Sequence, residues 1–227
     1  MTVLVIAEHD NNNLKSSTLN IITAATKFND EIHLIILGNS IDNLINNCQS
    51  LQEVSKILKC DHEKLENPIP EIMAPIIANI SKNYSHILAP ASTFGKNLLP
   101  RLSALLDVTQ ISDVIEIQNN NTFVRPIYAG NAISTVETNQ QINLLTIRPT
   151  AFDKCEESGG NASIEDIQFS DTETHTKFIG REVSQNDRPD LGNARVVVSG
   201  GRGLENSDNF KLLYELADKL NAAVGAS

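Results

Sequence analysis

Short apolar segments alternate with longer amphipathic segments through the first half of the chain. The short segments have the length of buried strands, and the long ones have the apolar spacing of helices. The expected strands are residues 2–7, 32–37, 54–58 and 85–90, and the expected helices are residues 14–28, 70–82 and 98–107. Strands that alternate with helices are typical of a parallel sheet covered by helices on both faces. The pattern therefore predicts an α/β domain.

The pattern changes after residue 107, where short apolar segments follow one another without helices. Four of these segments form two pairs around polar turns, residues 114–118 with 122–128 and residues 132–137 with 141–148. Asparagine is favoured in turns, and Asn119 to Asn121 fill the first of them. Each pair is predicted to form an antiparallel hairpin appended to the parallel sheet. Two further strands are expected at residues 164–169 and 177–183.

A polar segment that contains Pro189 and Gly192 precedes the last part of the chain. Proline and glycine in polar surroundings are typical of a linker. We therefore predict an N-terminal domain over residues 1–184, a linker over residues 185–194 and a second domain from residue 195.

The second domain has the pattern of a single strand-helix-strand unit. A strand over residues 195–199 leads into a glycine-rich loop, which is followed by a helix over residues 207–220 and a strand over residues 222–226. Asn206 or Ser207 is the expected N-cap of the helix. Because one such unit cannot bury a sufficient core, we expect the domain over residues 195–227 to be incomplete.

Composition narrows the class of protein and its partners. The 227 residues are 41% hydrophobic and 20% charged, as in globular proteins, and the net charge of −10 argues against a nucleic acid partner. Three cysteines are too few for a disulfide framework or a metal site, so we expect a reducing compartment and no metal. The chain starts without the features of a signal peptide, and no apolar run is long enough to span a membrane. A cytosolic protein, or a mitochondrial matrix protein without its transit peptide, is expected.

Candidate chemistry is sparse in the first domain. The loop Glu8 to Leu14 has no glycine and carries two acidic residues, which oppose a phosphate and disfavour a nucleotide-dependent enzyme. His33 and His86 lie within or beside apolar strands and are expected to be core or edge histidines. Residues 60–63 combine cysteine, aspartate, histidine and glutamate, and are interpreted as surface. Because no hydrolase or thiol-redox motif occurs, no catalytic residue is expected.

The strongest local signal is the segment VVVSGGRGL over residues 196–204. A strand leads into Gly200, Gly201, Arg202 and Gly203 just before a helix. Glycines let the backbone approach a phosphate, the helix directs its N–H groups there, and a guanidinium binds a pyrophosphate or a flavin edge. Asn206 stands where a GxGxxG motif has its third glycine. By spacing alone, a plain glycine-rich connection is an equal alternative.

VVVSGGRGL, together with the following NFKLLYELADKLNAAVGAS, resembles the start of the FAD-binding domain of electron transfer flavoprotein alpha subunits. The resemblance extends to DRPDL, FVRPIYAGNAISTV, RPTAF and LLPRLSALLDVTQISDV. It covers most of the chain and is weakest at residues 39–67 and 155–187. These motifs as a set are far more specific than the glycine loop alone.

The resemblance implies an N-terminal three-layer α/β domain followed by a flavodoxin-like FAD-binding domain. It implies an electron carrier rather than an enzyme, which pairs with a beta subunit. Such carriers take electrons from acyl-CoA and related dehydrogenases, as in fatty acid β-oxidation, and pass them towards a membrane quinone oxidoreductase.

The resemblance also assigns candidate FAD-binding residues. The family's arginine in SGGRG and its serine at the end of VGAS contact FAD, and they correspond to Arg202 and Ser227. Gly200, Gly201 and Gly203 complete the cofactor-binding candidates. Family members continue beyond this serine with further FAD-contacting loops, so we expect the FAD site to be incomplete in this chain. The alternative function is a non-redox interaction module that docks a beta subunit.

Overall fold

The computed structural model describes residues 2–180, 188–189, 191 and 194–227. The chain divides into two compact units, Met1–Phe178 and Ile179–Ser227. The expected linker, residues 185–194, lies mostly outside the described residues. The domain boundary after residue 184 therefore stays a prediction.

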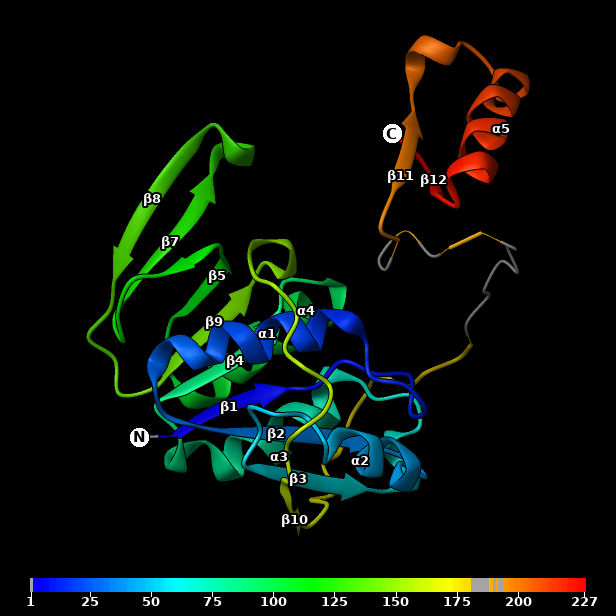
Figure 1. The fold of residues 1–227 in the computed structure, drawn as a ribbon. Coiled ribbons are helices and arrows are strands. Elements are labelled where there is room, and N and C mark those ends of the chain that lie inside the picture. The colour runs from blue at the N-terminus through cyan, green and yellow to red at the C-terminus, as the bar shows by residue number, and fades with distance from the viewer. Residues whose placement is uncertain (1, 181–187, 190, 192–193) are drawn as a thin grey trace. The chain divides into compact units, whose positions relative to one another are not determined.

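The first unit is built on a seven-stranded sheet in the order β10-β3-β2-β1-β4-β9-β5 (Figure 1). Its strands are β1 (Thr2–Ile6), β2 (Glu31–Gly38), β3 (Lys56–Asp61), β4 (His86–Pro90), β5 (Gln110–Val114), β9 (Asn143–Ile147) and β10 (Ser163–Asp166). Every pairing between these strands is parallel. The predicted α/β class with a mostly parallel sheet is confirmed.

Helices cover both faces of this sheet. They are α1 (Ser16–Ala25), α2 (Asp42–Cys48), α3 (Pro70–Ile80) and α4 (Thr93–Leu106), with single 3-10 turns at Thr26–Phe28, Glu63–Leu65, Ser81–Asn83 and Pro149–Ala151. Alternate residues of β1 point to opposite faces. Val3 and Val5 lie in one apolar cluster with α1 and α2, and Leu4 lies in the other with α3 and α4. This arrangement gives the three layers that the family resemblance implies.

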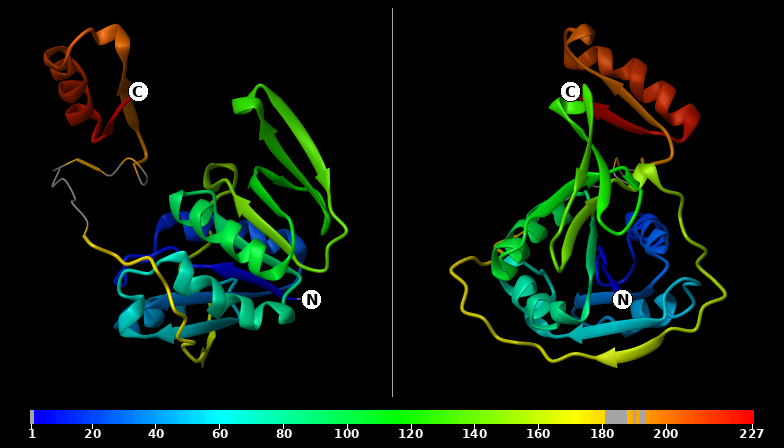
Figure 2. Two further views of the ribbon diagram at one scale, coloured as in Figure 1. Left: turned by 180° about the vertical axis from the view of Figure 1, so that it is seen from behind. Right: turned by 90° about the vertical axis from the view of Figure 1, so that its left-hand side faces the viewer.

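A three-stranded antiparallel sheet projects from the parallel sheet (Figure 2). It consists of β6 (Glu116–Ile117), β7 (Thr122–Ile127) and β8 (Ala132–Glu137), with a 3-10 turn at Tyr128–Gly130 between the last two. The expected turn at Asn119 to Asn121 is present, and Asn119 Oδ1 accepts a hydrogen bond from the Asn121 amide at 2.9 Å. The first predicted hairpin is thus confirmed as β6 and β7.

The second predicted hairpin is wrong. Residues 132–137 form β8, but β8 pairs with β7, whereas Asn143–Ile147 forms β9 between β4 and β5 of the parallel sheet. All five residues of β9 are buried, because its sequence NLLTI lacks the alternation of a strand with one solvated face. In contrast, exposure alternates along β8, as expected for an edge of a projecting sheet.

The antiparallel sheet is anchored to the parallel sheet through His86 at the start of β4. Its Nε2 lies 2.7 Å from the Asn120 carbonyl oxygen, and its Nδ1 lies 2.9 Å from Ser85 Oγ. The ring stacks on Phe28, with centroids 3.9 Å apart, and Phe123 packs edge-on against it. His86 is 1% exposed, so its interpretation as a core histidine is confirmed.

After β9 the chain runs along the outside of the parallel sheet to reach its far edge, where β10 pairs with β3 (Figure 2). The expected strand at residues 164–169 is therefore present over Ser163–Asp166. Lys177 to Gly180 have no regular structure, so that part of the expected strand over residues 177–183 is wrong. Its remainder lies outside the described residues.

The described residues of the second unit form two parallel strands and one helix. β11 (Val197–Gly200) pairs with β12 (Ala223–Ala226), and α5 (Lys211–Leu220) connects them, preceded by 3-10 turns at Arg202–Leu204 and Ser207–Phe210. Ala217 of α5 is fully buried where the helix packs against the strands. The predicted strand-helix-strand order is confirmed.

Candidate cofactor site

The carboxyl ends of β11 and β12 lie side by side. The parallel register pairs Gly200 with Ala226, and the Ser227 amide donates to the Gly200 carbonyl oxygen at 3.1 Å. Ligands of open α/β sheets are usually met at the carboxyl ends of strands. The pairing therefore brings two of the predicted site segments, SGGRG and the end of VGAS, to one edge.

Gly201 lies beside the side chain of Ser227. A Cβ on Gly201 would collide with Ser227 Oγ, so a larger residue there would displace the serine hydroxyl. A Cβ on Gly200 would instead collide with the side chains of Leu204 and Leu213. A side chain at either glycine would therefore require these neighbouring side chains to move.

Gly203 differs from them. No atom lies within 4 Å of a Cβ placed on it, and its φ is outside the left-handed region. Neither packing nor backbone conformation within the described residues explains a glycine there. An external group that approaches the loop closely would explain it.

Arg202 lies at the surface of the loop. Its side chain is exposed, and within the described part of the chain it forms no ion pair. The loop is closed by hydrogen bonds from the Leu204 amide to the Gly201 carbonyl oxygen (2.9 Å) and from the Glu205 amide to the Arg202 carbonyl oxygen (3.1 Å). The folded loop therefore exposes the Arg202 guanidinium, whose N–H donors are available to a ligand.

The expected contribution of the helix N-terminus is corrected. Asn206 is the N-cap of the helical segment, as predicted, and its Oδ1 accepts from the amides of Asp208 (3.0 Å) and Asn209 (3.1 Å). These two amides are therefore already bonded within the chain. The candidate anion donors are the loop and Arg202 rather than the helix.

Arg188 is a residue of the second unit that the sequence analysis missed. Its guanidinium forms a bidentate ion pair with Asp218 of α5, with Nε 2.8 Å and Nη2 3.1 Å from the carboxylate oxygens. It also lies 4.7 Å from the ring centroid of Tyr214. The motif DRPDL lies in the expected linker and contributes to the family resemblance, but the contact of its arginine with α5 is not apparent from the sequence.

The first unit carries an acidic group at the carboxyl ends of β1 and β4. Ser92 Oγ donates to Glu8 Oε2 at 2.7 Å, and Ser17 Oγ donates to the same oxygen at 3.3 Å. A carboxylate in this position repels phosphate, in agreement with the analysis of the glycine-free loop. Lys96 lies in the first turn of α4, and its amide bonds to the Ser92 carbonyl oxygen at 3.0 Å.

Other candidate residues of the first unit have structural partners. His33 Nδ1 lies 2.9 Å from the Tyr84 hydroxyl, and burial lowers the pKa of both His33 and His86.

The interpretation of residues 60–63 as surface is wrong for Cys60, which is 1% exposed because β3 continues to Asp61. Burial raises the pKa of the Cys60 thiol to about 11.

The described residues contain neither a candidate metal cluster nor a candidate membrane-spanning helix. Residues 2–180, 188–189, 191 and 194–227 contain no cluster of three or more His, Cys, Asp or Glu that could hold a metal. Within the same ranges, no helix has the length and apolar character needed to cross a bilayer.

Two models of known protein families match the chain. Residues 3–172 match the family model described as electron transfer flavoprotein domain, and residues 190–227 match the one described as electron transfer flavoprotein FAD-binding domain.

Similar proteins come from bacteria and eukaryotes. Electron transfer flavoprotein subunit alpha of Pseudomonas aeruginosa is 48% identical over 227 residues, which cover 100% of this chain and 74% of the relative. The mitochondrial electron transfer flavoprotein subunit alpha of Dictyostelium discoideum is 45% identical over 242 residues. The match covers 100% of this chain and 68% of the relative. The probable mitochondrial alpha subunit of Caenorhabditis elegans is 44% identical over 229 residues. The match covers 100% of this chain and 69% of the relative. The chain therefore belongs to the family of electron transfer flavoprotein alpha subunits.

Proposed function

We propose that this chain, paired with a beta subunit, binds FAD at the edge formed by β11 and β12. In this function it carries electrons from acyl-CoA and related dehydrogenases to a membrane quinone oxidoreductase. Its proposed location is the cytoplasm of a bacterium or the mitochondrial matrix. Membership of the family supports the role of electron carrier rather than catalyst.

The observation that supports FAD binding most directly is the meeting of Gly201, Arg202 and Ser227 at adjacent strand ends. Residues from two separate segments converge there, as they do in ligand sites of open α/β sheets. Within the described residues, the Arg202 guanidinium has no competing carboxylate.

The residues present fit the phosphate part of FAD. A guanidinium is planar and can donate two parallel hydrogen bonds to phosphate oxygens. The open space around Gly203 allows the backbone to approach such a group. Since the Ser227 amide is bonded to Gly200, the serine contributes its hydroxyl rather than its backbone N–H.

The roles of the protein and the cofactor differ. Bound FAD supplies the redox chemistry, while the protein binds it, orients it and positions it for partners. Arg202 would hold negative charge, Ser227 would offer a hydroxyl, and the glycines would keep the loop close to the strand ends.

The test combines FAD and the beta subunit from the same organism with a form of the chain that is extended by the remaining part of the FAD-binding domain of its relatives. We expect gel filtration to give a heterodimer with flavin absorbance, which an acyl-CoA dehydrogenase and its acyl-CoA bleach. Addition of the quinone oxidoreductase and quinone should restore the absorbance. A colourless heterodimer would instead support the second function, a non-redox module that docks the beta subunit.

A further inference from the structure

The carboxyl ends of β1 and β4 lie at the switch point of the parallel sheet, from which the chain connections run in opposite directions. β1 pairs with β2 on one side and with β4 on the other, and β9 and β5 follow beyond β4. Helix α1 covers one face of the sheet and α4 covers the other. Ligands of open α/β sheets bind at such a point. The first unit therefore has the position of a ligand site.

Glu8 places its carboxylate at this position. Its Oε2 accepts a hydrogen bond from the hydroxyl of Ser92, the N-cap residue of α4, at 2.7 Å. The same oxygen accepts from the hydroxyl of Ser17, in the first turn of α1, at 3.3 Å. One carboxylate oxygen is thus bonded to the starts of two helices on opposite faces of the sheet.

These two helix ends have no negative charge of their own. Neither α1 nor α4 carries an acidic residue in its first turn, and neither N-cap residue forms a side-chain capping bond. In the part of the chain that the structure describes, no lysine or arginine pairs with Glu8. The start of a helix carries partial positive charge, which a nearby anion stabilises. The helix ends and hydroxyls that bond to Glu8 are therefore groups that would suit a bound oxyanion.

The backbone of Glu8 is held in place by α1 and the residue before it. The Glu8 amide donates to Thr18 Oγ1 at 3.0 Å, and the Lys15 amide donates to the Glu8 carbonyl oxygen at 2.8 Å. Thr18 is fully buried. The chain therefore supplies the carboxylate from a fixed backbone, so that it is preorganised at the switch point.

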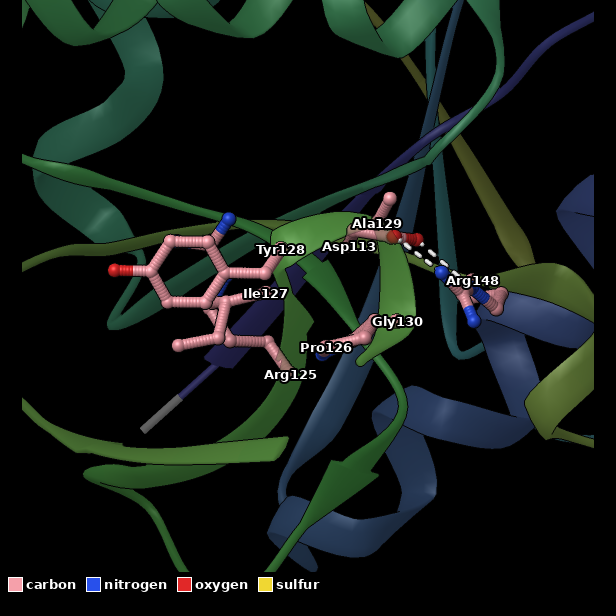
Figure 3. Close-up of a pocket in the computed structure, with 8 residues that line it drawn as sticks. All are labelled: Asp113, Arg125, Pro126, Ile127, Tyr128, Ala129, Gly130 and Arg148. Atoms are coloured by element: carbon pink, nitrogen blue, oxygen red, sulfur yellow. Dashed lines mark hydrogen bonds and ion pairs between the residues drawn. The ribbon is translucent and has the colours of Figure 1, made fainter. Parts of the chain in front are cut away.

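The same edge of the sheet shows a second carboxylate bonded in this way. A hollow of about 440 Å³ lies at the carboxyl ends of β5 and β9 (Figure 3). There Arg148 Nε donates to Asp113 Oδ1 at 3.0 Å, and Arg148 Nη2 donates to Asp113 Oδ2. Arginine binds the oxygens of carboxylate and phosphate groups with this bidentate geometry. At both places a carboxylate of the chain itself bonds to donors that an anionic ligand would use.

We propose that Glu8 is a built-in anion, which fills the ligand position at the switch point and excludes free oxyanions from the first unit. Removing its side chain should convert the switch point into a binding site for a small oxyanion, such as a carboxylate. This inference is independent of FAD binding by the second unit.

The test follows thermal unfolding of the 227-residue chain by circular dichroism in sodium formate and in sodium chloride of equal ionic strength. Formate at about 0.1 M should raise the midpoint of Glu8→Ala by at least about 3 °C, and should change that of the wild type by less than about 1 °C. Glu31→Ala is the matched control and should behave as the wild type, because the Glu31 carboxylate is exposed at the amino end of β2. A folded Glu8→Ala with the same midpoint in both salts would overturn the inference.

Glu8→Gln tests the charge separately and is expected to fold, because glutamine has nearly the same size and keeps an acceptor for Ser92. It lacks the negative charge that stabilises the two helix ends, so its midpoint should lie about 2–6 °C below that of the wild type. Formate should not restore the midpoint, since the amide fills the space. A Glu8→Gln variant as stable as the wild type would overturn the inference, even if Glu8→Ala does not fold.

Discussion

At the scale of single residues, the surroundings of a side chain separate binding candidates from structural ones. Arg202 is exposed at the end of β11, where two strands meet, and has no ion-pair partner among the described residues. Arg188 has the same side chain, but its guanidinium is bound to Asp218 and lies over Tyr214. The sequence singled out Arg202 through its glycine-rich setting, whereas nothing near Arg188 indicated a distant carboxylate.

In a protein whose FAD-binding domain is complete and which is paired with the beta subunit, replacing Arg202 by alanine should weaken FAD binding. A hydrogen bond to a charged group contributes roughly 1.5–3 kcal/mol, which corresponds to an increase in the dissociation constant of about tenfold to hundredfold. Arg202→Lys should recover part of the affinity, because it keeps the charge but loses the planar pair of donors. Titration of FAD followed by flavin fluorescence measures the effect.

Arg195→Ala is the matched control, since Arg195 is also exposed but lies before β11 rather than after it. The affinity of the Arg195→Ala variant for FAD should equal that of the wild type. Equal affinity in Arg202→Ala would assign Arg202 to a structural or partner-binding role.

At the scale of elements, local pattern and pairing are separate questions. The sequence predicts strands at both β8 and β9, but the predicted pairing between them is wrong. The short polar turn between them favours a hairpin, while NLLTI lacks the polar–apolar alternation of a strand with one solvated face. The second signal decides, because β9 in its buried position between β4 and β5 removes more apolar surface from water than it would as a hairpin strand.

The contact of α4 with β4 predicts that a glycine-to-alanine substitution inside a helix lowers the free energy of unfolding instead of raising it. Gly95 lies inside α4, where alanine is ordinarily more favourable than glycine by about 1 kcal/mol. A Cβ on Gly95 would collide with the Pro90 carbonyl oxygen, which belongs to the backbone and cannot rotate away. Gly95→Ala should therefore lower the free energy of unfolding by about 1–3 kcal/mol, measured by urea denaturation.

Gly180→Ala provides the control for this measurement, because a Cβ there meets no atom within 4 Å. It should leave stability within about 0.5 kcal/mol of the wild type. An increase in stability for Gly95→Ala would show that α4 can shift away from β4 without loss of packing.

At the scale of the whole molecule, the first unit has the core of an independent domain. Apolar clusters fill both sides of its sheet, and β10 closes the edge beside β3. The segment after β10 is also held, since Phe169 stacks on His62 at 3.8 Å and Asp171 pairs with Lys64 at 2.7 Å. These contacts keep the end of the domain attached to its body.

Residues 1–184 expressed alone should therefore fold and bind the beta subunit. Cooperative thermal unfolding by circular dichroism tests the first point, and gel filtration of the co-expressed pair tests the second. A well-folded fragment that elutes apart from the beta subunit at micromolar concentration would show that the second unit makes the decisive contacts.

The sequence by itself determined the class of the fold, the position of most strands and helices, and the family. These depend on local periodicity and on short motifs, which are readable along one stretch of chain. It also identified the glycine loop and Arg202 as candidates for FAD binding.

Only the tertiary structure decided which strands are neighbours and which side chains meet. It placed β9 inside the parallel sheet, Ser227 against Gly201, and Arg148 against Asp113 at the hollow. Each of these contacts joins residues that are distant in the chain, and its energy depends on burial and geometry in three dimensions. Local pattern carries no record of that geometry, because the same strand or arginine satisfies its local preferences beside many different partners.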